Sequence, residues 1–265
     1  MSGLSTDAVS DLLREVAAQV ITPRFRSLGE GEVMEKNPGD LVTVADREAE
    51  SLISAALREA YPDAAVLGEE AFAADAGLVD RYLAAEHAFT VDPVDGTKNF
   101  VHGSPDHAVM VAEVVGGESV RAWIHQPAHG VTWTAERGGG TWRDGERMTT
   151  TPVAEGTLPR GATSMWSLRG HALDGLPAMR LSWVCCGVDY PRLVEGETDY
   201  IVYSRSNPWD HAPGTLMVTE AGGAVVHPDG SPYSARSTRP GLVVAVDAHT
   251  AGAVQRRAAS AFRRD

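Results

Sequence analysis

The stretch VDPVDGTKNF, residues 91–100, decides both the fold and the chemistry expected of this chain. An apolar run at residues 88–91 predicts a strand that ends at two carboxylates, Asp92 and Asp95. The glycine that follows, Gly96, lets a phosphate approach the backbone closely, and the next residues are typical of a short helix whose free N–H groups attract anions. Carboxylates that suit a divalent ion, beside N–H groups that suit a phosphate, indicate metal-assisted phosphate chemistry.

Length and charge limit the functions that this chain can have. Its 265 residues are 43% hydrophobic, enough for one large domain or two closely packed halves. The net charge of −13 argues against a nucleic acid partner, because the phosphate backbone needs a basic protein face. An acidic enzyme can still bind an anionic substrate if bound metal ions supply the positive charge.

Several features predict a cytoplasmic protein without a membrane partner. The adjacent Cys185 and Cys186 are poorly placed to bridge each other and are typical of reduced thiols in the cytosol. The N-terminal residues lack the pattern of a signal peptide, and no apolar run approaches the roughly 20 residues that span a bilayer.

The first half of the chain has the pattern of helices packed on a mostly antiparallel sheet. Helical spacing of apolar residues predicts helices over residues 7–28 and 44–61, with Pro23 expected to kink or shorten the first. A turn-rich loop is expected at residues 35–40. A strand at 65–68 is followed later by the expected meander of strands at 107–115, 119–127 and 130–138.

The second half has an α/β pattern. The expected strands are residues 180–186, 198–204, 222–228 and 241–247, and the expected helices are 187–196, 210–221 and 250–262. We therefore divide the chain into an N-terminal α+β half, residues 1–150, and a smaller C-terminal α/β half, residues 151–265.

Three acidic clusters lie where elements begin or end, and each has a simpler explanation when taken alone. Asp-Pro and Asp-Gly pairs mark turns, the pair Glu69 and Glu70 suits a helix start, and Asp210 suits a helix N-cap. Three such clusters together favour a site that binds metal.

The clusters also carry a family resemblance. The segments GEE (68–70), DPVDGTKNFVHG (92–103) and PWDHAPGTLMVTEAGG (208–223), in this order, resemble the inositol monophosphatase family of the lithium-sensitive, magnesium-dependent phosphatase superfamily. The segment KNPGDLVTVADREAE (36–50) is similar to the family as well. The resemblance implies a layered αβαβα sandwich of the α+β class with the site between its halves.

The resemblance also implies roles for the matching residues. Glu69, Asp92 and the carbonyl of Val94 would hold one Mg²⁺, and Asp92, Asp95 and Asp210 a second, with a weaker third ion near Glu69. Thr97 would orient the attacking water with the help of Glu69 and Asp46. The N–H groups of Gly96 and Thr97 would hold the phosphate, with Asp210 also facing the substrate.

The residues expected to contact the substrate depart from the family pattern. VCCG at residues 184–187 replaces a stretch of small residues found in many relatives, and Tyr203 stands where inositol-cleaving relatives have a glutamate. Arg205 suits a second anion of the substrate but also an ordinary surface position, and Asp189 suits a substrate contact or a structural cap. Lys36 lies in the loop that approaches the site in relatives, and is equally well explained as a solvated lysine.

The sequence thus predicts a Mg²⁺-dependent phosphatase of small phosphate monoesters, with two or three ions per site. Inositol 1-phosphate leads the candidates, followed by histidinol phosphate and a 3′(2′),5′-bisphosphate nucleotide, with a sugar bisphosphate last. Lithium sensitivity and a homodimer are implied by the family. The alternative of another class is a non-catalytic regulatory protein that keeps the fold and binds a partner.

Overall fold

The computed structural model describes residues 3–258 and 262, and its central element is a seven-stranded sheet in the order β3-β4-β5-β6-β7-β8-β9. Its strands are Ala65–Gly68 (β3), His87–Asp95 (β4), Ala108–Val115 (β5), Glu118–Gln126 (β6), Val131–Glu136 (β7), Gly140–Arg143 (β8) and Glu146–Met148 (β9). Neighbouring strands are antiparallel except β3 and β4, which are parallel. The mostly antiparallel sheet and its meander are confirmed.

A second, five-stranded sheet has the order β11-β10-β12-β14-β13. Its strands are Gly161–Thr163 (β10), Arg180–Leu181 (β11), Tyr200–Tyr203 (β12), Ala224–Val226 (β13) and Leu242–Ala245 (β14). β10 pairs in parallel with β11 and β12, whereas β14 pairs antiparallel with β12 and β13. This mixed sheet agrees with the α/β pattern of the second half.

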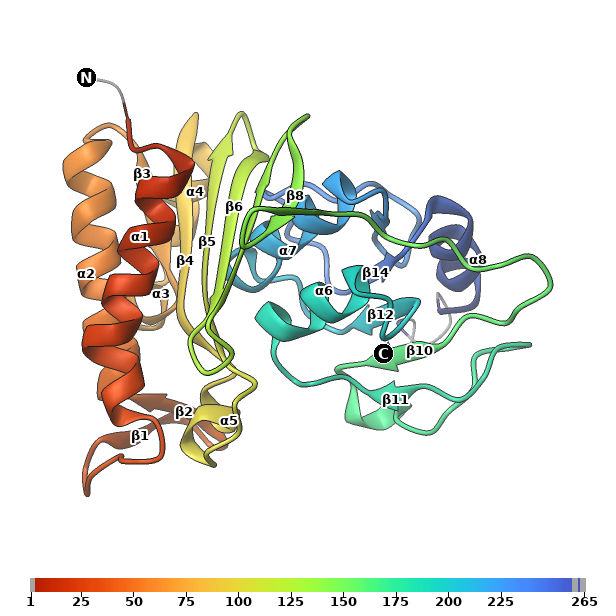
Figure 1. The fold of residues 1–265 in the computed structure, drawn as a ribbon, viewed down its shortest axis with the longest axis horizontal. Helices are drawn as coiled ribbons and strands as arrows, with labels where there is room; N and C mark the ends of the chain where they lie inside the picture. The colour runs from red at the N-terminus through yellow and green to blue at the C-terminus, as the bar shows by residue number, and fades with distance from the viewer. Residues whose placement is uncertain (1–2, 259–261, 263–265) are drawn as a thin grey trace.

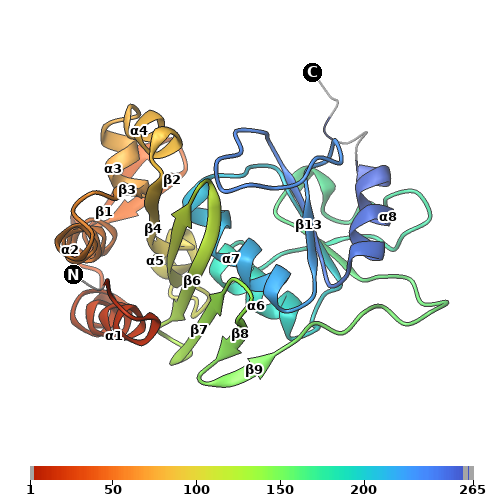
Figure 2. The same cartoon turned by 90° about the horizontal axis from the view of Figure 1, so that it is seen from above.

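Helices separate and cover the two sheets (Figure 1). The helices α1 (Thr6–Val16) and α2 (Val44–Ala60) cover the outer face of the large sheet, and α8 (Ala248–Ala258) covers the outer face of the small one. Seen from above, α6 (Cys186–Val194) and α7 (Pro208–Glu220) lie between the sheets (Figure 2). The layered αβαβα arrangement is confirmed.

The middle layer explains why α7 is apolar around its whole circumference. Nine of its residues are buried, because both sheets contact it. Leu216 and Met217 belong to a core cluster that joins Trp133 of the large sheet to Val244 of the small one. This packing fixes the start of α7, and with it Asp210, at the boundary of the two sheets. In the part of the chain that the structure describes, no helix has the length and apolar character needed to cross a membrane.

The first helix is shorter than expected. The α-helix ends at Val16 and continues as a π-helical turn, Ala17–Ile21, and a 3₁₀ turn, Thr22–Arg24. Pro23 lies in that last turn, where its missing N–H prevents a regular helical hydrogen bond. The shortening expected from this proline is therefore confirmed. The last helical turn ends at Arg24 rather than at residue 28, and the regular α-helix ends at Val16. The second helix ends one residue before the expected position.

Two other expectations need correction. The loop at residues 35–40 is largely a β-hairpin, Val33–Asn37 (β1) with Asp40–Thr43 (β2), because Gly39 takes the positive φ of 78° that a tight turn requires. The strand expected at 180–186 is only Arg180–Leu181, and Cys186 already belongs to α6. The chain leaves the strand because Val184 has a left-handed φ of 56°.

The sequence pattern missed short elements. These are α4 (Leu78–Ala84), β8, β9 and β10. The last expected helix, 250–262, begins at Ala248, and residues 259–261 of it lie outside the described residues. Two short helices follow the acidic segments of the first half. The helix α3 (Glu69–Ala74) begins directly after β3, and α5 (Thr97–Val101) begins directly after the turn that ends β4.

Candidate active site

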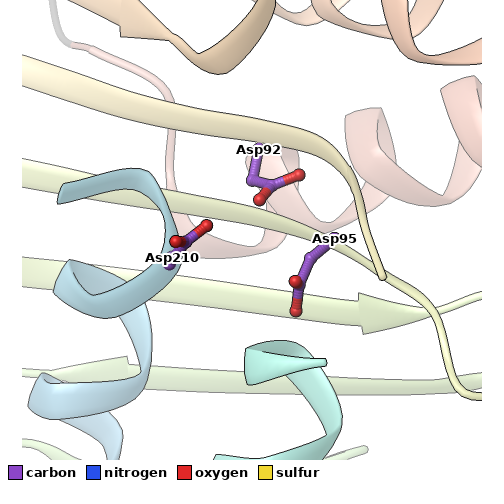
Figure 3. Close-up of side chains that lie close together, drawn as sticks. All are labelled: Asp92, Asp95 and Asp210. Carbon is purple, nitrogen blue, oxygen red and sulfur yellow. The ribbon is translucent and has the colours of Figure 1, made fainter. Parts of the chain in front are cut away.

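A β-bulge places Asp92 and Asp95 on the same side of β4. Asp92 pairs with Met110 and Asp95 with Ala108, so three residue steps on β4 match two on β5. Side chains three residues apart point to opposite faces of a regular strand, but the extra residue of a bulge turns the second one back. Figure 3 shows both carboxylates directed toward the space in front of Asp210.

Asp210 completes the cluster from the first turn of α7. One carboxylate oxygen of each of Asp92, Asp95 and Asp210 lies within 4.8 Å of the others. Asn207 donates from Nδ2 to Asp210 Oδ2 at 3.0 Å, and Asp92 Oδ1 is buried without a hydrogen-bond partner. Three carboxylates with an unsatisfied buried oxygen fit a hard divalent cation, which carboxylate oxygens bind preferentially.

The pKa values of the three groups reflect this crowding. Burial, followed by the negative charges of Glu69 and Asp95, raises the pKa of Asp92 well above its usual value. Burial also raises the pKa of Asp210 well above its usual value and that of Asp95 to about 6. The cluster is therefore short of positive charge, which a bound cation would provide.

The start of α6 holds Asp95. The N–H of Gly187 donates to Asp95 Oδ2, and Cys185 Sγ lies 3.1 Å from the same oxygen. A Cβ atom on Gly187 would lie 2.4 Å from Ala108 Cβ, so only glycine allows α6 to approach β5 this closely. Cys185 is buried at the N-cap of α6, which corrects the expectation that both thiols lie on a strand.

Substituting Gly187 with alanine is expected to destabilise the protein by about 1–3 kcal/mol, because the added methyl group overpacks the contact with β5. Affinity for the metal is expected to fall about 10–100-fold, because Asp95 loses its support. Thermal unfolding and metal titration measure the two effects. Gly252→Ala in α8, where a Cβ would meet only the flexible Arg256, is the control and should be neutral or stabilising. Equal effects of the two substitutions would contradict this role of Gly187.

Thr97 and Asp46 form a second polar pair beside the cluster. Thr97 Oγ1 lies 3.1 Å from Asp46 Oδ1 and 3.0 Å from the carbonyl of Val94. Asp46 is buried near the start of α2, where its other oxygen accepts from the N–H of Thr43 at 2.8 Å. Burial raises the pKa of Asp46 to about 6. The hydroxyl that donates to Asp46 keeps lone pairs that can accept a hydrogen bond from a water molecule.

Gly96 lies between Asp95 of the carboxylate cluster and Thr97 of the Thr97–Asp46 pair. It has a left-handed φ of 80°, and a Cβ atom there would lie 2.9 Å from the carbonyl oxygen of Asp106. Its conformation turns the chain from β4 into α5, which begins at Thr97. The N–H groups at this turn lie next to Asp95.

Glu69 approaches the cluster but is not one of the three grouped carboxylates. Lys36 of β1 donates from Nζ to Glu69 Oε1 and to Glu70 Oε1, both at 2.8 Å, and its side chain is only 11% exposed. Lys36 is therefore not a freely solvated surface lysine. The hairpin of β1 and β2 brings this ammonium group to the acidic start of α3.

Sequence reasoning missed Glu50, which organises the same region from α2. Its two oxygens accept from the N–H groups of Glu70 at 2.7 Å and Ala71 at 2.8 Å. Glu50 is 6% exposed, and burial raises its pKa to about 7. Glu50 ends the segment 36–50 that resembles the family, but nothing in its spacing distinguishes it from an exposed helical glutamate.

A pocket of about 170 Å³ opens beside the metal cluster. Its lining includes Tyr203, Arg205 and Asp189. Tyr203 is 2% exposed and its hydroxyl has no partner among the described residues, whereas Asp189 accepts from the N–H of Trp183 at 2.8 Å. Arg205 is exposed and also borders a larger pocket of about 860 Å³ on the side of Lys36.

Comparisons with known proteins agree with this fold. A model of the inositol monophosphatase family matches residues 5–263. A fructose-1,6-bisphosphatase/inositol-1-monophosphatase from Thermotoga maritima is 32% identical, covering 79% of this chain and 80% of the relative. An inositol-1-monophosphatase from Rhizobium meliloti is also 32% identical, over 92% and 94%. A solved structure of the Thermotoga maritima IMPase has a TM-score of 0.79 at 27% identity, over 97% and 96%.

The layered fold and its family relatives define a phosphatase that hydrolyses phosphate monoesters. The chain belongs to the inositol monophosphatase family. This confirms the resemblance drawn from the three acidic segments. The acidic cluster of Asp92, Asp95 and Asp210 can bind a metal, in keeping with a metal-dependent family.

Proposed function

We propose that this protein is a Mg²⁺-dependent phosphatase that hydrolyses a small phosphate monoester by attack of an activated water, with inositol 1-phosphate as the leading substrate. One observation carries the proposal: oxygens of Asp92, Asp95 and Asp210 gather within 4.8 Å, and Asp92 Oδ1 has no other partner. The family and its relatives named as inositol monophosphatases support the substrate class.

The proposed ligands follow the expected pattern. Glu69, Asp92 and the carbonyl of Val94 would hold one Mg²⁺, and Asp92, Asp95 and Asp210 would hold the second, with a weaker third ion near Glu69. Bound Mg²⁺ supplies a lowered pKa for the attacking water and neutralises charge on the phosphate and leaving oxygen. The ammonium of Lys36 partly balances the charge of Glu69.

The remaining steps depend on the residues around these ligands. Thr97, fixed by its bond to Asp46, accepts a hydrogen bond from the attacking water and orients it, with Glu69 as a further acceptor. The N–H groups of Gly96 and Thr97 bind phosphate oxygens. Asp210 lies where the leaving alcohol departs and also contacts the substrate. Because phosphoryl transfer needs mainly positioning and neutralised charge, these groups suffice for the chemistry.

The leaving group occupies the 170 Å³ pocket. Tyr203 forms part of its wall, and Arg205 lies where it can bind a second anionic group of the substrate. Asp189, with Oδ1 bonded to Trp183, supports the wall and keeps Oδ2 as a buried acceptor. Histidinol phosphate and a 3′(2′),5′-bisphosphate nucleotide remain the alternative substrates. We further propose a cytoplasmic homodimer that is sensitive to lithium.

The test is phosphate release from a panel of these esters, measured with Mg²⁺ and with a chelator. We expect release that requires Mg²⁺. No release from any ester, or release unchanged by the chelator, would reject the proposal. Lack of turnover with an intact metal-binding site would instead favour a non-catalytic regulatory protein.

Tyr203→Glu tests the substrate assignment. A carboxylate at this position restores a strong acceptor for a ring hydroxyl, so kcat/KM for inositol 1-phosphate is expected to rise about tenfold relative to the other esters. Tyr203→Phe is the matched control and should keep the wild-type preference, because the hydroxyl has no partner. Thermal unfolding checks that the buried glutamate is tolerated. A folded glutamate variant with an unchanged preference would show that Tyr203 does not set the substrate.

A further inference from the structure

Val184 has a backbone conformation that its side chain disfavours. Three non-glycine residues in the described ranges have positive φ, namely Arg26, Asp144 and Val184, at 60°, 47° and 56°. Aspartate tolerates this left-handed region, but a β-branched residue is crowded there. Val184 is the β-branched member of the three, and it immediately precedes the N-cap of α6.

The left-handed turn itself is needed by the site. Ser182 Oγ accepts from the N–H of Val184 at 3.1 Å, and Asn99 donates to the carbonyl of Trp183 at 3.0 Å. These bonds fix the turn that directs Cys185 and Gly187 toward Asp95. Glycine would adopt the same conformation without strain, so the conformation alone does not explain a valine.

Core packing does not explain the valine either. Val184 is 39% exposed and belongs to none of the apolar clusters formed by the described residues. It lines the 170 Å³ pocket together with Asp95, Cys186 and Tyr203. Ligand pockets usually measure about 300–1,000 Å³, so this pocket is small. In a pocket of this size, the isopropyl group of one valine occupies a large part of the space that a ligand could use.

We propose that Val184 is a specificity-determining residue that narrows the leaving-group pocket and restricts the enzyme to compact alcohols such as a single polyol ring. The inference rests on the proposed phosphatase function and deepens it. A nucleoside, with its base attached to the ribose, is excluded by the side chain of Val184. This makes a bisphosphate nucleotide a poorer substrate than inositol 1-phosphate.

Three substitutions separate side-chain size from backbone strain. Val184→Gly removes the side chain and the strain. Val184→Ala shortens the side chain and relieves only the β-branched part of the strain, because its Cβ atom stays in the left-handed region. Val184→Asn keeps the size in a residue that tolerates positive φ. The measured quantity is kcat/KM for adenosine 3′,5′-bisphosphate divided by kcat/KM for inositol 1-phosphate. We expect this ratio to rise about tenfold in the Gly and Ala variants and to change less than about threefold in the Asn variant.

Stability provides an independent readout. The melting temperature is expected to rise most in the Gly and Asn variants, because the strain is relieved, and less in the Ala variant, which keeps a Cβ atom in the left-handed region. Val115→Ala is the control, because Val115 is also 39% exposed but lies away from the pocket. It should leave the ratio of the two kcat/KM values unchanged.

The outcomes distinguish the two proposals. A ratio that stays constant in the Gly and Ala variants, or that changes in Gly and Asn but not in Ala, overturns the role of the Val184 side chain. Absence of Mg²⁺-dependent phosphate release by the wild-type protein from every ester of the panel overturns the proposed function instead.

Discussion

Replacing Asp210 with asparagine is expected to lower kcat about 10³-fold or more while the protein remains folded. The amide keeps the shape of the side chain but removes one of the three charges that gather within 4.8 Å. Loss of a ligand weakens the neutralisation of charge in the transition state by several kcal/mol, and each ~1.4 kcal/mol is a factor of ten in rate. Phosphate release at saturating Mg²⁺ measures the effect.

The same variant is expected to be at least as stable as the wild type without metal. Repulsion within the cluster contributes to the raised pKa values of Asp92 and Asp210, and the amide removes part of that repulsion. Asp80→Asn, in the first turn of α4, is the control and should keep full activity. A near-native rate for Asp210→Asn would show that Asp210 does not bind a catalytic metal.

Removing Mg²⁺ is the second change with a large expected effect. Phosphatase activity should disappear without Mg²⁺. Saturating Mg²⁺ should raise the melting temperature by about 5–10 °C. This range follows because a ligand at a hundredfold excess over its Kd stabilises the folded state by ~2.7 kcal/mol, and each kcal/mol raises the melting temperature by ~2–4 °C. The gain should be larger at about pH 8 than at about pH 5, because protons compete with the metal for the carboxylates.

The metal-free protein should itself show an unusual dependence on pH. A carboxyl group with a higher pKa in the folded state binds protons more tightly when folded, so it favours folding at low pH and loses this contribution as pH rises through the raised pKa. For Asp95 the window runs from the usual 3.8 to about 6, and the raised pKa values of Asp92 and Asp210 act in the same direction. Thermal unfolding in a chelator should therefore show stability falling across this range.

Two observations would contradict the predicted stabilisation by Mg²⁺. One is a melting temperature that Mg²⁺ does not change at any pH. The other is a Mg²⁺-induced gain that is as large at about pH 5 as at about pH 8, because the cluster would then not exchange protons for metal.

Much of the fold was accessible from the sequence because its periodicities are regular. The meander between residues 107 and 138 alternates or runs apolar between clear turns, and α2 has a continuous apolar face. The segment 180–186 misled because its composition suits a strand. In the folded chain the N–H groups of Trp183 and Val184 donate to the side chains of Asp189 and Ser182, and these bonds turn the chain toward α6. Such bonds form only in the folded protein and leave no periodic signal.

The candidate site divides in the same way. The family resemblance of the acidic segments implied which carboxylates meet, and the structure brings Asp92, Asp95 and Asp210 together. Glu69, expected with them, is outside this group and is bonded to Lys36. The bulge that turns Asp95 toward Asp92 has no signal beyond Pro93, which cannot donate to the sheet. The bonds of Lys36 and Glu50 to the start of α3 depend on long-range packing, which the local sequence does not encode.

The most direct test of the proposed metal site is a crystal structure grown with Mn²⁺ in place of Mg²⁺, read by anomalous scattering. We expect anomalous peaks bonded to carboxylate oxygens of Asp92, Asp95 and Asp210, with Asp92 shared between two ions. Metal bound only elsewhere, in crystals of protein that releases phosphate with Mn²⁺ in solution, would contradict the assignment of these residues.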